Sequence, residues 1–345
     1  MKNVITSSSS SLSRRAFLAA AGAGSLAAVL GLTGCAQGSS GSSSSASSAA
    51  SAAALKSVVI GTLATEDILP MWVAESEGAF KDAGIEAGVT VFQSATELIA
   101  GVSSGSVNLA MTDPMVAASI FASGTDIQMP WVTLGATAAQ GRFGIQTGPN
   151  SGVTSLTDLA GQGIGVGSNT ILEYVMDKLM ERAGVADADI VTTELQKLPV
   201  RYQAMMSGEV KAAALPGSLL ALGEASGATT LADDTTGENI SQSVMIVRTD
   251  WLDSEGGQAT LEAVEGVWNA CAKKINANPE SYRALLVEKA NLNDAVAQTY
   301  PVSEYPLCAL PTNDMVDPIL EWMLGKGYLT KSIVYTGSTG KFSLV

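Results

Sequence analysis

Histidine is absent from this sequence of 345 residues. Imidazole is the commonest side-chain ligand of zinc, a frequent ligand of copper and iron, and the usual base beside a serine or cysteine nucleophile. Its absence excludes most transition-metal sites and every Ser-His or Cys-His catalytic pair. We therefore expect neither a metal ion nor a cofactor, and we predict that the protein is not an enzyme.

Basic residues are also scarce: 19 lysines and arginines stand against 33 acidic residues, for a net charge of −14. A chain this acidic repels nucleic acids and anionic membrane surfaces, so we expect neither as a partner. Most basic residues between Val58 and Asp250 fall on predicted helix surfaces. All the basic residues in this range are Lys81, Arg142, Lys178, Arg182, Lys197, Arg201, Lys211 and Arg248. Arg142 is the one that we expect near a binding cleft.

The apolar run Ala19–Leu32 is too short and too rich in alanine and glycine for a stable membrane-spanning helix. The twin-arginine pair Arg14-Arg15 precedes it, and Leu32-Thr33-Gly34-Cys35 follows it and looks like a bacterial lipobox. An accidental cysteine in a signal peptide is the alternative. The pattern predicts a signal peptide over residues 1–34, export by the twin-arginine route, and lipidation of Cys35.

Residues 35–55 are almost all serine, alanine and glycine, a composition typical of a flexible tether with no capacity to form a core. Acyl chains on Cys35 would hold the protein at the cell membrane. We therefore predict an extracytoplasmic domain, lipid-anchored to the cell membrane through this tether.

Two further cysteines remain. Cys271 shares one helical stripe with Leu261, Val264, Trp268 and Ile275, which predicts a buried and inert thiol. A disulfide between Cys271 and Cys308 is the alternative, since the predicted location is outside the cytoplasm.

Three strand-to-helix junctions follow one another after Val58. The expected strands are 58–61, 89–92 and 107–110; the polar segments after them are Thr65-Glu66-Asp67, Ser94-Ala95-Thr96-Glu97 and Thr112-Asp113-Pro114. A helix is expected from Pro70 to Gly84, and Ser94 and Glu97 have the spacing of a capping box. Such a series builds an open parallel sheet, and ligands bind outside the carboxyl ends of its strands.

The second half repeats this pattern. Expected strands at 163–166 and 211–215 lead to Ser168-Asn169-Thr170 and Pro216-Gly217-Ser218, and Thr170 and Glu173 have capping-box spacing. The turn cluster at 149–152 and the apolar run at 243–247 mark two crossings between domains. The sequence predicts an α/β fold of two lobes joined by a two-segment hinge, each lobe a mainly parallel sheet flanked by helices. Lobe 1 comprises residues 56–141 and 245–345, and lobe 2 comprises 142–244. From Leu261 onward we expect helices that pack on lobe 1.

The chain resembles the periplasmic solute-binding proteins of ABC importers for nitrate, taurine, alkanesulfonates and thiamine-pyrimidine precursors. The matching residues are Pro70, Trp72, Val73, Ala74, Gly78, Phe80, Ala83, Gly84, Ile85, Gly105, Val107, Asn108, Leu109 and Ala110, and Ser155–Val166 resembles the motif that opens the second domain of this family. The resemblance implies the type II periplasmic-binding fold, hinge closure on a small solute, delivery to an ABC permease with its ATPase, and a monomer.

Two other functions remain open. The wider superfamily includes pyrimidine-forming and chorismate-processing enzymes, as the resemblance implies. The pyrimidine-forming enzymes use an active-site histidine, which this chain lacks, and an export signal suits neither pathway. A ligand-sensing subunit for a membrane receptor is the second alternative.

The candidate site residues lie at the predicted strand ends and helix N-termini. Helix starts offer unpaired N–H donors to an anionic group, although plain capping explains the same residues. Carboxylates near the cleft mouth would oppose a bare oxyanion such as nitrate and would suit a ligand with an amine, an amidine or a protonated heterocycle. We expect the ligand to be a small organic solute: a sulfonate, a pyrimidine or vitamin precursor, or another amine-bearing compound. The candidates are Thr65, Glu66, Asp67, Ser94, Ala95, Thr96, Thr112, Asp113, Arg142, Ser168, Asn169, Thr170, Pro216 and Ser218.

Glycines alternate at Gly161, Gly163, Gly165 and Gly167, along a predicted strand. This period of two lacks the G-x-G-x-x-G spacing that opens a nucleotide-binding helix, so it is a weak indication of any cofactor. Trp131, at the start of a predicted strand, is a residue that could stack on a flat ligand.

Overall fold

The computed structural model describes residues 54–292 and 294–345, which belong to one folded unit. The predicted signal peptide, Cys35 and nearly all of the tether lie outside the described residues. Within the described part of the chain, no helix is both long enough and apolar enough to cross a membrane.

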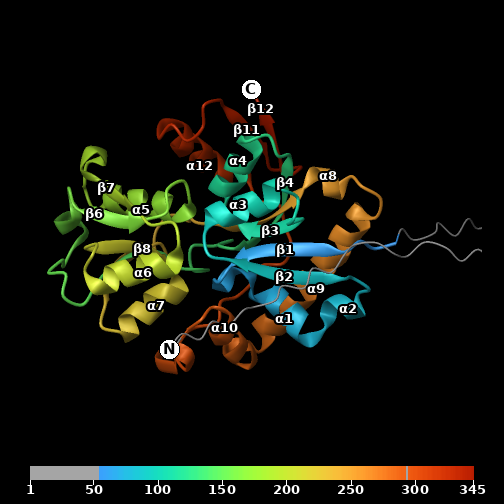
Figure 1. The fold of residues 1–345 in the computed structure, drawn as a ribbon, viewed down its shortest axis with the longest axis horizontal. Helices are drawn as coiled ribbons and strands as arrows, with labels where there is room; N and C mark the ends of the chain where they lie inside the picture. The colour runs from blue at the N-terminus through green and yellow to red at the C-terminus, as the bar shows by residue number, and fades with distance from the viewer. Residues whose placement is uncertain (1–53, 293) are drawn as a thin grey trace, which may run out of the picture. The chain divides into compact units, whose positions relative to one another are not determined.

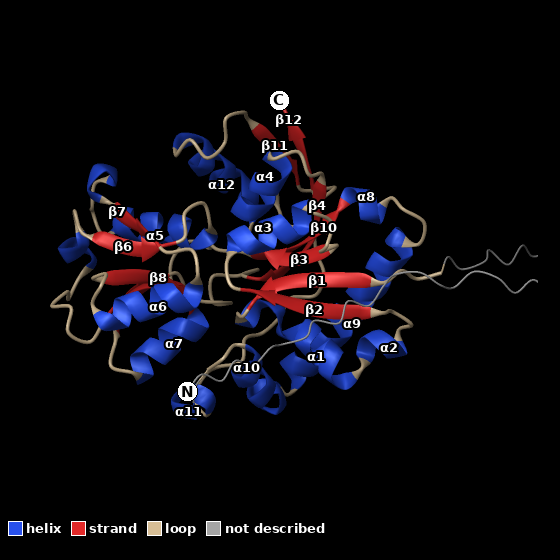
Figure 2. Ribbon diagram, viewed as in Figure 1, coloured by secondary structure: helices blue, strands red, loops and turns tan. Residues whose placement is uncertain are grey.

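The first sheet has seven strands in the order β11-β12-β4-β10-β3-β1-β2 (Figure 2). They are β1 (Val58–Leu63), β2 (Ala87–Phe92), β3 (Leu109–Thr112), β4 (Ile127–Leu134), β10 (Ser243–Arg248), β11 (Ile333–Thr336) and β12 (Lys341–Leu344). β1 pairs in parallel with β2 and β3, whereas β10 lies antiparallel between β3 and β4. We call this sheet and its helices lobe 1.

Helices cover both faces of the first sheet (Figure 2). One face carries α1 (Leu69–Glu77), α2 (Ala79–Asp82), α9 (Gly257–Ala277) and α10 (Arg283–Lys289); the other carries α3 (Ala95–Ser103), α4 (Pro114–Ala122) and α12 (Asn313–Gly325). The core between the sheet and the first of these helix layers contains Trp72, Trp131 and Trp268. The ring centroids of Trp131 and Trp268 lie 5.8 Å apart. Trp131 is therefore a core residue. The remaining elements of lobe 1 are η1 (Glu66–Ile68), α8 (Thr249–Leu252), η4 (Pro279–Tyr282) and α11 (Asp294–Ala297).

The second sheet has five strands in the order β7-β6-β8-β5-β9. They are β5 (Phe143–Thr147), β6 (Gly163–Val166), β7 (Val191–Glu194), β8 (Ala212–Pro216) and β9 (Thr229–Asp233). α5 (Ile171–Arg182) covers one face, and α6 (Leu198–Ser207) and α7 (Gly217–Ala225) cover the other (Figure 1). Two short turns, η2 (Leu156–Leu159) and η3 (Asp187–Asp189), complete what we call lobe 2.

The predicted two-lobed α/β class is confirmed. The chain passes from the first sheet to the second between β4 and β5 and returns between β9 and β10. Both sheets are mixed, with more antiparallel pairing than the sequence predicted: β5 runs antiparallel to β8 and β9, and β10 to β3 and β4. An apolar strand that is buried on both faces has the same composition in either direction, so its pattern cannot reveal the orientation.

Two predictions about the elements of lobe 1 are wrong in detail. The helix expected from Pro70 to Gly84 is interrupted at Gly78, whose φ of 75° is left-handed and ends α1. The C-terminal segment is not only helical, because β11 and β12 form a hairpin that extends the first sheet. Each of these strands has only four residues, too few for their alternation to be recognised in the sequence.

Both described cysteines are free thiols, so the alternative of a Cys271–Cys308 disulfide is wrong. Cys271 is buried on the α9 stripe with Leu261, Val264 and Trp268, as predicted. α9 packs against α1, and α12 packs against α4. The late helices therefore lie on lobe 1, also as predicted.

Candidate functional site

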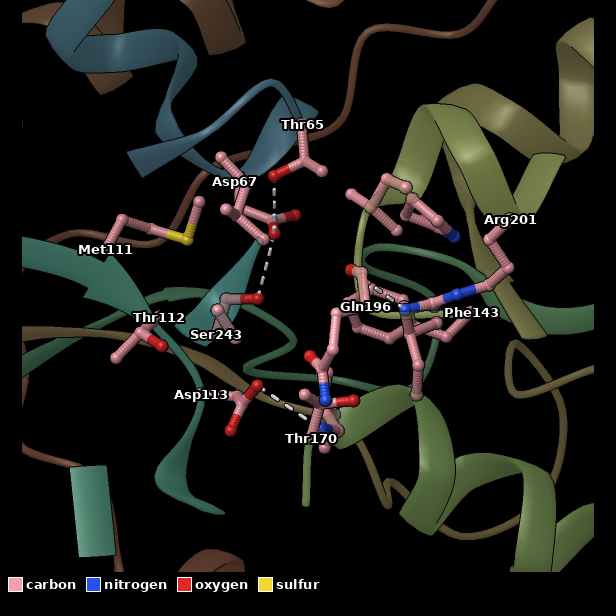
Figure 3. A pocket seen from close by; sticks show the side chains of 16 residues that line it. Thr65, Asp67, Met111, Thr112, Asp113, Phe143, Thr170, Gln196, Arg201 and Ser243 are labelled. Carbon is pink, nitrogen blue, oxygen red and sulfur yellow. Dashed lines mark hydrogen bonds between the residues drawn. The ribbon is translucent and has the colours of Figure 1, made fainter. Parts of the chain in front are cut away.

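A small cavity of about 60 Å³ lies where the strand ends of the two lobes meet (Figure 3). Lobe 1 lines it with Leu63, Thr65, Asp67, Ala95, Met111, Thr112, Asp113 and Ser243; lobe 2 lines it with Phe143, Thr170, Ile171, Leu172, Gln196, Leu198, Arg201 and Pro216. Parallel strands β1, β3, β6 and β8 end at this edge. Antiparallel β5 and β10 start there, which is why Phe143 and Ser243 join the lining.

Half of the candidate residues line this cavity, and half do not. Thr65, Asp67, Ala95, Thr112, Asp113, Thr170 and Pro216 line it, whereas Glu66, Ser94, Thr96, Arg142, Ser168, Asn169 and Ser218 lie outside the lining. Ser94 caps α3 by accepting a hydrogen bond from the backbone N–H of Glu97 at 3.3 Å. Ser168 donates to the carboxylate of Glu194, and Asn169 Nδ2 donates across the lobes to Ser119 Oγ at 2.7 Å. These groups have structural partners already.

Arg142 is neutralised within its own lobe. Its Nε donates to Asp233 Oδ2 at 2.8 Å, and its Nη2 donates to Glu224 Oε1 at 2.7 Å. It faces a neighbouring crevice that also contains Glu66, whose Oε1 accepts a hydrogen bond from the Tyr300 hydroxyl at 2.7 Å. Arg142 is therefore not a free charge at the central cavity.

Asp113 connects helix starts from both lobes. Its Oδ1 accepts from the N–H of Val116 at 2.8 Å and caps α4, and its Oδ2 accepts from the N–H of Ile171 at 3.2 Å, the first residue of α5. The capping box predicted at Thr170 is wrong, because the Thr170 hydroxyl donates to the carbonyl of Gly167 at 2.7 Å instead. Unpaired N–H groups at a helix start require an acceptor, and here the other lobe supplies one.

Burial raises the pKa of Asp113 to about 6, against the effect of its backbone hydrogen bonds. Burial, followed by the nearby charge of Glu66, raises the pKa of Asp67 to about 8. Asp67 Oδ2 accepts from the Ser243 hydroxyl at 3.1 Å and from the Thr65 hydroxyl at 3.3 Å. At neutral pH the Asp67 carboxyl is therefore mostly protonated and can donate a hydrogen bond into the cavity. This weakens the carboxylate repulsion that the sequence suggested.

Arg201 is the lining residue that sequence reasoning misplaced. We expected it on a helix surface, but it is only 2% exposed and its guanidinium reaches the cavity beside Gln196 (Figure 3). A signal was present: Leu198, Arg201, Tyr202 and Met205 follow the i, i+3, i+4, i+7 spacing of one helical face, and all four are buried. Because arginine is charged, it was predicted on the helix surface although its spacing matches the buried face.

Apolar side chains form much of the remaining lining. Leu63, Met111, Phe143 and Leu198 come from both lobes, and sequence analysis named none of them as site residues. Among the described residues, no group of three or more cysteine, aspartate or glutamate side chains could hold a metal ion. The arrangement presents the guanidinium of Arg201, the mostly protonated carboxyl of Asp67, the carboxylate of Asp113 and several hydroxyls around an apolar interior.

Two α/β lobes with a cavity at their facing strand ends define the fold of the periplasmic binding proteins. The alkanesulfonate-binding protein SsuA from Xanthomonas axonopodis pv. citri, solved with MOPS bound, is similar in structure with a TM-score of 0.67, 16% identity, and coverage of 80% of this chain and 95% of its own. The aliphatic sulphonate-binding protein SsuA from Escherichia coli has a TM-score of 0.65 and 17% identity, with coverage of 80% of this chain and 89% of its own. A ligand-binding component of an ABC-type import system from Staphylococcus aureus, solved with zinc bound, has a TM-score of 0.66 and 14% identity. It covers 79% of this chain and 92% of its own.

The sequence itself places the chain in a family. The profile of the NMT1/THI5-like family matches residues 65–280, more than half of the chain, and the protein therefore belongs to this family. The comparison with curated protein sequences gives no match. The resemblance stated from Pro70 onward is thus confirmed.

Proposed function

We propose that this protein is the extracytoplasmic substrate-binding component of an ABC importer, which captures a small organic solute between its lobes and delivers it to the permease. The observation that carries the proposal is the cavity at the strand ends, enclosed by residues of both lobes in a chain of this family. A ligand that contacts both lobes stabilises the arrangement in which they face each other, so binding shifts a conformational equilibrium.

Binding without catalysis accounts for the chemistry of the cavity. The sequence has no histidine, and the titratable side chains of the lining are Asp67, Asp113 and Arg201. Asp67 is the one of these that accepts hydrogen bonds from serine and threonine hydroxyls, those of Thr65 and Ser243. Burial raises its pKa to about 8, so at neutral pH the carboxyl is mostly protonated and we do not assign it as a catalytic base. A binding protein needs only the complementary surface that these groups provide.

The test is thermal unfolding of the unacylated chain, Cys35→Ser, with sulfonates, pyrimidines, amino acids and purines. A ligand that binds only the folded state adds about 2.7 kcal/mol of stability at a hundredfold excess over its Kd. We expect one chemical class to raise Tm, and we expect Asp67→Ala to reduce that shift. Asp82→Ala, an exposed aspartate of the same lobe, should leave the shift unchanged. No shift from any class, together with no ligand found by mass spectrometry of the denatured protein, would contradict the proposal.

A further inference from the structure

Gly165 in β6 and Gly167 just after it lie against one buried arginine. A Cβ on Gly165 would lie 3.4 Å from Arg201 Cγ, and a Cβ on Gly167 would lie 2.6 Å from Arg201 Nη2. The second distance is shorter than real Cβ contacts allow, so any side chain at position 167 would displace the guanidinium. The missing side chain at position 167 therefore leaves room for the guanidinium where it reaches the cavity.

Backbone carbonyl groups hold the Arg201 guanidinium in place. Nε donates to the carbonyl of Leu195 at 2.8 Å, Nη1 to that of Ala214 at 3.0 Å, and Nη2 to that of Gln196 at 3.4 Å. These bonds use three of the five N–H groups of a guanidinium. Carbonyl oxygens fix its orientation, but they carry no full charge that would neutralise it.

Arg201 differs in this respect from the other arginines of the described residues. Arg142, Arg182, Arg248 and Arg283 each form an ion pair with a carboxylate, whereas Arg201 forms none within residues 54–292 and 294–345. Glu194 is the carboxylate whose charge acts on Arg201, but its oxygens accept from Ser168 and Gln196. A buried cation without a counterion is costly, and an anion entering the cavity would offset that cost.

The lobe 1 residues that line the cavity opposite Arg201 can accommodate an anionic ligand. Asp67, mostly protonated at neutral pH, offers a donor, and its Oδ1 has no hydrogen-bond partner in the described part of the chain. Both oxygens of Asp113 already accept from helix N-termini, which offset its charge. Between these walls lie Leu63, Met111 and Phe143, which suit an apolar body.

We propose that the ligand of this cavity is a small organic anion whose carboxylate, sulfonate or phosphonate group binds the Arg201 guanidinium. The planar fork of arginine matches two oxygens of such a group. This inference rests on the binding function proposed above and names the class of its substrate. It replaces the amine-bearing solute that the acidic residues suggested, because Arg201 has no ion pair in the described residues whereas two helix N-termini offset the charge of Asp113.

The experiment compares ligands that share a butyl chain and differ in the charge of the headgroup. The unacylated full chain is tested by calorimetry and thermal unfolding with pentanoate, butanesulfonate and butylphosphonate, with the neutral pentanamide and butanesulfonamide, and with pentylamine. We expect the anions to bind and the neutral and cationic compounds to bind at least about 30-fold more weakly, as expected when a buried charge loses its partner. The three anions also separate the headgroups from one another.

Two variants test the residue itself. Arg201→Gln should lose the preference for anions while the neutral amides keep their affinity, a change that a purely structural role would not produce. Gly167→Ala keeps the charge but displaces it, and should weaken anion binding about tenfold or more, as for other misplaced binding groups. The matched controls are Arg182→Gln, a surface arginine of the same lobe, and Gly88→Ala, a strand glycine with open space around its Cα. If Arg201→Gln fails to fold, the anion affinities of Gly167→Ala and Arg201→Lys decide whether Arg201 binds the anion.

Several outcomes would overturn the inference. They are equal affinity for pentanoate and pentanamide, unchanged anion affinity in Gly167→Ala and the Arg201 variants, or binding of the amine alone. In each case a ligand still binds, so the proposed binding function stands. If none of these compounds and no member of the wider library binds, the binding function fails together with this inference.

Discussion

At the scale of single residues, the cavity is defined by charges that burial has shifted. Asp67 and Arg201 face it from different lobes, and burial raises the pKa of Asp67 to about 8 and lowers that of Arg201 to about 10. At neutral pH one is mostly a neutral donor and the other a cation. Residue types alone suggested an acidic cleft, whereas the buried site also contains the cation of Arg201, which has no ion pair in the described residues.

Asp67 should make the stability of the protein depend on pH. Its pKa in the folded state, about 8, lies above the value of about 3.9 in an unfolded chain, so the folded state holds a proton that the unfolded state releases between these values. The free energy of unfolding should therefore fall as pH rises from about 4 to about 8. One proton corresponds to a slope of about 1.4 kcal/mol per pH unit.

Asp67→Asn should remove this contribution and leave those of Glu66 and Asp113, whose pKa values burial also raises. Urea unfolding at a series of pH values measures the effect, with exposed Asp82→Asn as the control. A variant with the same slope as the wild type would show that Asp67 is ionised in the folded state.

At the scale of elements, helix α5 depends on the other lobe for its N-terminal cap. Thr170 occupies the cap position but directs its hydroxyl to Gly167, and Asp113 accepts the N–H of Ile171. The same carboxylate caps α4. One side chain therefore couples the folding of two helices with the contact between the lobes.

Asp113→Ala should lower the free energy of unfolding by about 1–2 kcal/mol, the usual cost of losing an N-cap. Hydrogen exchange should accelerate at the amides of Val116 and Ile171 in the same variant. Thr170→Val, which keeps the shape of the side chain, should leave exchange at Ile171 nearly unchanged. Equal protection of Ile171 in the wild type and in Asp113→Ala would refute the cross-lobe cap. Urea unfolding and mass-spectrometric exchange provide the two measurements.

At the scale of the whole molecule, several contacts tie α5 to the C-terminal segment. Lys326 Nζ lies 2.7 Å from Asp177 Oδ2, and the Tyr328 hydroxyl donates to Glu173 Oε1 at 2.8 Å. The ring of Trp322 meets that of Tyr174 edge-on at 5.4 Å. These contacts join residues of the two lobes, so a change in the arrangement of the lobes must break or reform them.

Export and anchoring are predictions for the N-terminal segment, which lies outside the described residues. We expect the mature protein to begin at an acylated Cys35, and mass spectrometry of its first peptide measures this directly. Cys35→Ser should release the protein from the membrane fraction. Replacing Arg14 and Arg15 by lysine should retain it in the cytoplasm, since the twin-arginine route requires the pair. A mature N-terminus elsewhere would contradict the lipoprotein prediction.

The long elements and their order could be predicted from the sequence because their signals are local. The period of apolar residues marked α5, α9 and α12, and glycines at Gly84, Gly184 and Gly208 marked where helices stop. Short strands such as β7, β9, β11 and β12 were missed. Four or five residues carry too little periodicity, and these strands form because a neighbouring strand offers hydrogen bonds.

The sequence by itself determined the α/β class, the two lobes and the edge at which Thr65, Asp67, Thr112, Asp113 and Thr170 gather. These features follow from the polar residues placed at strand ends. Only the tertiary structure decided which charges remain free. It pairs Arg142 with Asp233 and Glu224, and it buries Arg201 beside Gly167 without an ion pair in the described residues. Pairing and burial depend on residues far apart in the chain, so no local pattern could reveal them.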